Sequence, residues 1–133
     1  METIGGGFGE FGLAMIIFLV ARPVLQAILN RMRTNGKTVP EWLKKVSQFV
    51  TRYHRYFGMV AVVAILLHFI LQFTQLGLSP VPGLIAGGVL MVQAVLGFVL
   101  RGQKDPEQRK KLALAHRSLG IVLVVAILFH RIL

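Results

Sequence analysis

The stretch "HRYFGMVAVVAILLH" occupies residues 54–68, and a near copy, "HRSLGIVLVVAILFH", occupies residues 116–130. Extended to residues 71 and 133, the two segments are identical at twelve of eighteen positions, including both histidines, the arginine and the glycine. The chain has four histidines in all, and each lies at one end of these copies. The pattern indicates that a helix with a histidine at each end occurs twice in the fold.

The composition is that of an integral membrane protein. Hydrophobic residues make up 55% of the 133 residues, and most of the charge lies in a few blocks. Four apolar runs reach the length of about 20 residues that a membrane-spanning helix needs. We predict spans at about 8–30, 53–73, 82–100 and 112–133. Because the connections are short, neighbouring helices should pack antiparallel. The sequence therefore predicts one all-α domain over residues 1–133, an integral membrane four-helix bundle.

A weaker similarity links the first and third spans. Residues 12–25 read "GLAMIIFLVARPVL" and residues 83–96 read "GLIAGGVLMVQAVL". Together with the histidine segments, this predicts a tandem repeat of a two-helix hairpin, related by an axis along the membrane normal. Residues 40–52 place Trp42 and other apolar residues at helical spacing among lysines. We expect this segment to form a separate helix that lies in the membrane interface.

The formal net charge of +10 is unevenly distributed. Lysines and arginines gather between the first and second spans and between the third and fourth, whereas the connection at 74–82 is uncharged. The positive-inside rule places both basic loops in the cytoplasm and both termini outside. We predict a bacterial cytoplasmic membrane as the location, with the basic residues contacting anionic membrane lipid and not nucleic acid.

Two absences restrict the chemistry. Without cysteine, the chain can form no disulfide, no thiolate metal site and no covalent haem attachment through C-x-x-C-H. No Asp or Glu lies in the apolar interior of a predicted span, which argues against proton pumping, where such relays are expected.

The histidine spacing predicts two facing pairs. Fourteen residues of helix turn through about 1400° and rise about 21 Å, so His54 and His68 share one face near opposite edges of the membrane. The second and fourth spans run in the same direction. His54 should therefore lie level with His116 on the cytoplasmic side, and His68 level with His130 on the outer side. Histidines at membrane depth are functional candidates, although a hydrogen bond to a neighbouring helix is the alternative for each.

The number of histidines at each level narrows the kinds of metal site that they could form. Zinc takes four protein ligands, or three and a water, and copper favours Cys or Met in its ligand set. Haem needs only two axial ligands, because the porphyrin supplies the other four nitrogens. We therefore expect two haem b groups, with His54/His116 and His68/His130 as iron ligands. Gly58 and Gly120, one turn after a histidine, would let a flat macrocycle approach the backbone, and Gly83 and Gly97 repeat the interval of fourteen.

At these residues the chain resembles the di-haem b-type membrane cytochromes, including cytochrome b of respiratory quinol–cytochrome c reductases. The resemblance rests on His54-x13-His68 and His116-x13-His130 within four spans. It implies bis-histidine haems stacked across a four-helix bundle. The haem propionates would need cations, and the candidates are Arg22, Arg52, Arg55 and Arg117 on the cytoplasmic side and Arg131 outside.

With both axial positions filled, the expected function is transmembrane electron transfer through the two haems, and no catalytic residue is predicted. An electron-transfer protein is therefore favoured over a self-contained enzyme. Two alternatives remain open. One is a membrane oxidoreductase that uses a haem edge with quinol or an external acceptor, and the other is a non-redox membrane subunit whose histidines serve packing. A quinone or a redox partner protein would be the partner of either an electron-transfer protein or an oxidoreductase.

Overall fold

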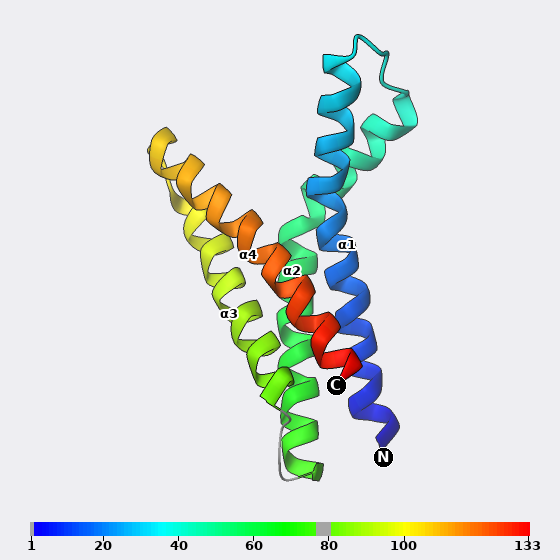
Figure 1. Cartoon of the computed structure of the whole chain (residues 1–133), viewed down its shortest axis with the longest axis vertical. Coiled ribbons are helices and arrows are strands. Elements are labelled where there is room, and N and C mark those ends of the chain that lie inside the picture. The colour runs from blue at the N-terminus through cyan, green and yellow to red at the C-terminus, as the bar shows by residue number, and fades with distance from the viewer. Residues whose placement is uncertain (1, 77–80) are drawn as a thin grey trace.

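The computed structural model describes the backbone of residues 2–76 and 81–133 and the side chains of residues 6–74 and 81–133. It contains four helices, α1 (Glu2–Thr34), α2 (Glu41–Leu76), α3 (Val81–Gly102) and α4 (Pro106–Ile132) (Figure 1). The prediction of an all-α, four-helix fold is confirmed. Part of the uncharged connection predicted between α2 and α3, at 77–80, lies outside the described residues.

The helices form two hairpins. α1 packs along α2 and α3 packs along α4, whereas packing between the hairpins is sparser and lies mainly between α2 and α3. The start of α1 and the end of α4 lie at the same end of the bundle (Figure 1). The predicted order of two successive hairpins is therefore confirmed, and the two histidine-bearing helices belong to different hairpins.

Local sequence explains where the helices of each basic loop end and begin. After α1, Gly36 adopts a φ of +69°, and the Gly36 and Lys37 amides donate to the carbonyls of Arg33 and Met32. This is the Schellman geometry that favours glycine. At α4, the Asp105 side chain accepts a hydrogen bond from the Glu107 amide and Pro106 opens the first turn. Each basic loop is thus short and well defined by its own residues.

The predicted interfacial helix at 40–52 is not separate. The structure shows α2 as one continuous helix from Glu41, because no proline interrupts it and its apolar face has a partner. Leu43 is buried in a cluster with Leu29 of α1 and Val39. This face therefore packs against α1, and the hairpin continues beyond the second predicted span, although Trp42 remains 66% exposed.

All four helices are long and apolar enough to span a membrane. Their outer surfaces expose large apolar side chains that water would disfavour, for example Ile17 on α1, Met59 on α2, Phe98 on α3 and Ile121 on α4. Lipid is the environment that such surfaces fit. The fold is that of an integral membrane protein in contact with lipid.

Candidate functional site

Two histidine pairs bridge the hairpins. The rings of His54 on α2 and His116 on α4 have centroids 6.3 Å apart, with planes at 77°. The rings of His68 and His130 have centroids 6.4 Å apart, with planes at 74°. All four side chains are half-buried. The structure thus brings together the same two pairs that the fourteen-residue interval predicts, with nearly the same geometry at both levels.

These separations can be compared with metal coordination. An imidazole nitrogen lies about 1 Å from its ring centre and about 2 Å from a bound metal ion, so one ion held by two facing imidazoles separates their centres by about 6 Å. The two observed distances are close to this value. The spacing of each pair therefore suits two ligands of one metal ion.

We call His54/His116 the upper pair and His68/His130 the lower pair. The hydrogen-bonding state of the upper pair also points to a further ligand. The Nδ1 atoms of His54 and His116 are buried and have no hydrogen-bond partner. A buried polar nitrogen without a partner is costly, and imidazole binds metals through either nitrogen. Among the described residues there is no group of three or more His, Cys, Asp or Glu that could hold a metal ion. The donor set fits a metal whose remaining ligands come with it, as they do in haem.

Glycines on the neighbouring helix of the same hairpin make room for three of the rings. A Cβ added at Gly9 would lie 3.0 Å from Cε1 of His68, one at Gly83 would lie 3.0 Å from Cε1 of His130, and one at Gly97 would lie 3.2 Å from Cε1 of His116. Such contacts are too close for a larger residue unless the ring moves. Gly83 and Gly97 are fourteen residues apart, as are the histidines they contact. The contact of Gly9 is one that the sequence did not reveal.

The two glycines expected to approach a macrocycle have other neighbours. A Cβ at Gly58 would first meet Leu19 Cδ2 at 4.0 Å, and one at Gly120 would meet Gln93 Nε2 at 3.3 Å. The structure does not bring either glycine against a histidine of another helix, and their role at a macrocycle stays a prediction. Gln93 also donates from Nε2 to the carbonyl of His116 at 2.8 Å. It therefore holds the backbone of a ligand candidate, a contact that the sequence reasoning missed.

Two arginines lie near the upper pair. Arg22 of α1 is half-buried and lies within electrostatic range of His54, His116 and Arg117. Among the residues whose side chains are described, the ion pairs are Lys44–Glu41 and Arg131–Glu10, so neither Arg22 nor Arg117 has a carboxylate partner there. The positive charge of these two arginines is therefore not offset by a carboxylate among the described side chains.

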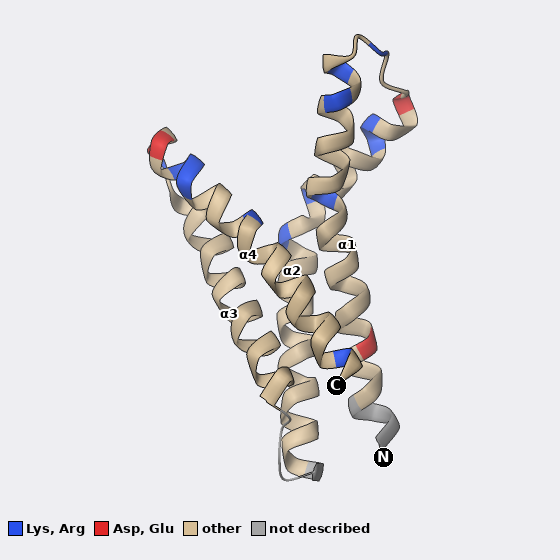
Figure 2. Ribbon diagram, viewed as in Figure 1, with Lys and Arg blue, Asp and Glu red and all other residues tan. Residues whose placement is uncertain are grey.

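The other three candidate arginines have protein partners. Arg55 donates to Tyr56 Oη at 2.7 Å and its guanidinium lies over that ring. The Arg52 guanidinium lies 5.8 Å from the centre of the Tyr53 ring. Arg131 forms an ion pair with Glu10, which links α4 to α1 beside the lower pair. Their contacts with propionates stay predictions. Figure 2 shows most of the basic residues toward the ends of the hairpins opposite the two termini.

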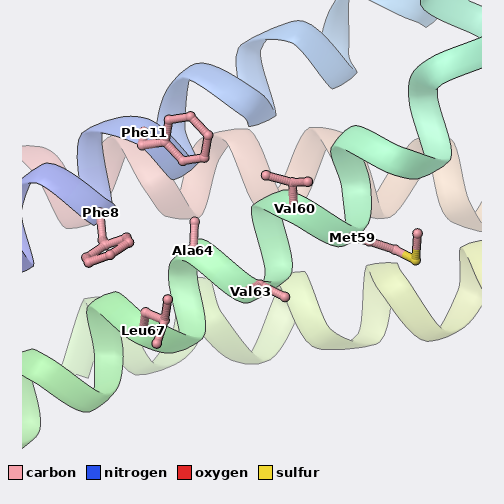
Figure 3. Close-up of a pocket in the computed structure, with 7 residues that line it drawn as sticks. All are labelled: Phe8, Phe11, Met59, Val60, Val63, Ala64 and Leu67. Carbon is pink, nitrogen blue, oxygen red and sulfur yellow. The ribbon is translucent and has the colours of Figure 1, made fainter.

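An apolar cavity of about 240 Å³ lies between α1 and α2 (Figure 3). Its walls come from Phe8 and Phe11 on α1 and from five apolar residues of α2, Met59, Val60, Val63, Ala64 and Leu67. Several of these side chains are exposed on the surface that faces lipid, such as Met59 at 60% and Val63 at 57%. All the described side chains that line it are apolar, so they suit a hydrocarbon chain.

Comparisons with protein-family models, curated proteins and solved structures find no match to this chain. The residues themselves define a four-helix protein of membrane type in which two histidine pairs face each other between the hairpins.

Proposed function

We propose that this chain carries electrons across a membrane through two b-type haems, one held by His54 and His116 and the other by His68 and His130. The observation that carries the proposal is the pair of ring separations, 6.3 Å and 6.4 Å, at two levels of one bundle. The glycines against the rings of His68, His130 and His116 support it, because they favour one orientation of each imidazole.

In this function the protein positions the two haems and separates the electron path from water. The four histidines would hold the two haems, and haem supplies a one-electron couple when it is bound. The fourteen-residue interval sets the two levels about 21 Å apart along α2 and along α4. Apolar side chains on the outer surfaces keep the bundle in lipid and water away from the path.

Electron transfer across vesicles tests the proposal. The haem-loaded protein would be reconstituted into vesicles that contain ferricyanide, with a membrane-impermeant reductant added outside. We expect internal ferricyanide to be reduced in these vesicles and not in vesicles with the His54→Ala/His68→Ala chain. If the loaded protein is reduced outside but the internal acceptor stays oxidised, the protein is not a transmembrane conduit.

The cations near the upper pair lead to a prediction about potential. Replacing Arg22 or Arg117 with glutamine removes a positive charge that disfavours the oxidised iron. The midpoint potential of the His54/His116 haem should fall by ~50 mV, an effect on the order of 1 kcal/mol. A spectroelectrochemical titration would resolve the two haems.

The control for that titration is Lys110→Gln, which removes one exposed charge from the other basic region. It should leave both potentials within the error of the titration. Equal shifts at both haems in the Arg22 and Arg117 variants would contradict the placement of these cations beside one level.

A membrane oxidoreductase is the second candidate function. It would use the same haems, with quinol or an external acceptor reacting at a haem edge. A rate of haem reduction that saturates with quinol concentration would favour it over the simple conduit. A non-redox subunit is the third candidate, and a protein that takes up no haem during purification would favour that one.

A further inference from the structure

A second cavity lies at the cytoplasmic end predicted for the α1–α2 hairpin. It has a volume of about 410 Å³ and is lined by both helices, among them Arg33 on α1 and Lys44 and Arg52 on α2. Lys44 and Arg52 are eight residues apart, a little over two helical turns, and both line the cavity from α2. The cavity therefore has cations from both helices along its walls.

Neutral donors line the inner part of this cavity. Gln26 donates from Nε2 to Ser47 Oγ at 3.2 Å, which joins α1 to α2. Ser47 is 6% exposed and Leu29, which also lines the cavity, is 3% exposed, so both side chains are buried. A hydroxyl that accepts one hydrogen bond still has a proton to donate. The floor thus presents a polar group beneath three cations.

The charge of the cavity is not neutralised by its own lining. None of the described residues that line it is acidic. Glu41 lies 3.8 Å from Lys44, but both side chains are largely exposed, and such surface pairs contribute little. The Arg52 guanidinium lies over the Tyr53 ring, 5.8 Å from its centre, an arrangement in which the N–H groups can still donate in the plane of the guanidinium. An anion is the ligand that this set of donors fits.

The position of the cavity favours a lipid as the source of that anion. Its lining residues lie where α1 leaves its apolar run. Figure 2 shows basic residues gathered at that end of the hairpin. Ile28, Val46 and Phe49 near it are exposed and apolar, which suits acyl chains. Basic pockets between membrane helices on this side bind anionic headgroups. We propose that the cavity binds the phosphate of an anionic glycerophospholipid, independently of the haems.

Lipid retention measured by native mass spectrometry tests this site. The detergent-purified chain would be titrated with phosphatidylglycerol and, separately, with phosphatidylcholine. We expect one phosphatidylglycerol to bind selectively. In the Arg33→Gln/Lys44→Gln/Arg52→Gln variant its affinity should fall about 100-fold, because each basic residue near the membrane contributes about 1 kcal/mol. Ser47→Ala, which keeps all the charges, should weaken binding several-fold.

A matched control removes the same charge from the basic region at the connection between α3 and α4. The Lys104→Gln/Lys110→Gln/Lys111→Gln variant should bind phosphatidylglycerol like the unmodified chain. Equal loss in this control, or equal binding of phosphatidylcholine, would overturn the site. Competition with inorganic phosphate is the last measurement. If it displaces phosphatidylglycerol at equimolar concentration, the cavity binds a free anion and the lipid assignment is wrong.

Discussion

Alanine at His68 or at His130 is expected to leave one haem on each chain in place of two. In the proposed function each pair would supply both protein ligands of one haem, so the loss of either ring would remove one of the two protein ligands at that level. The other level keeps both imidazoles, with centroids 6.3 Å apart. His54→Ala and His116→Ala should likewise leave only the haem of the lower pair. Quantitation of haem against protein concentration measures the ratio.

Apolar neighbours of the ligands supply the matched controls. Ile70→Ala on α2 and Ile132→Ala on α4 each shorten an exposed side chain two residues from a histidine, and both should retain two haems. The variant His54→Ala/His68→Ala should bind none. Retention of two haems after any single histidine change would contradict the pairing, and so would the loss of both haems from a protein that stays folded by circular dichroism.

Valine at Gly97 is expected to empty the upper haem site while the lower one stays filled. A Cβ at this position would lie 3.2 Å from Cε1 of His116, and the methyl groups of valine would come closer still. Overpacking of this kind costs typically 1–3 kcal/mol, so haem affinity at this level should fall about 10- to 100-fold. Gly83→Val should act in the same way on the lower site through His130.

The same helix contains the control. Gly88 has no atom within 4 Å of its added Cβ, so Gly88→Val tests the helix without crowding a ring. Haem titration followed in the visible spectrum gives the two affinities. Gly97 and Gly83 act through the histidines and are positioning residues, so their variants should also change the spectrum of any haem that remains bound. Equal effects of the Gly88 and Gly97 variants would show that the glycines matter only for helix packing.

The two levels differ in their charged surroundings. The upper pair has Arg22 and Arg117 within reach and no described acidic partner for them. Beside the lower pair, Arg131 is paired with Glu10, so positive and negative charge offset each other. If haem is bound at both levels, the upper one should be the more easily reduced. The direction of spontaneous electron transfer between the two haems would follow from this difference in potential.

The sequence by itself determined the four helices, their order in two hairpins and the register of the histidines. These features depend on short-range properties: the length of an apolar run, a turn at Gly36 or Asp105, and fourteen residues making almost four turns. Two helices with the same interval and the same direction must place their histidines at matching levels. The ring pairs of the structure follow from that constraint.

Only the tertiary structure decided what surrounds the rings. It brought Gly9 against His68, a contact that the sequence had not indicated. It also placed Gly83 and Gly97, which the sequence had marked only by their interval, against His130 and His116, and gave Gly58 and Gly120 other neighbours. It also gave Arg131 a partner in Glu10, 121 residues away along the chain. These contacts depend on how each helix is rotated against its neighbour and on side-chain rotamers. Neither is encoded in the spacing along one helix, because both are set by packing between segments that are distant in sequence.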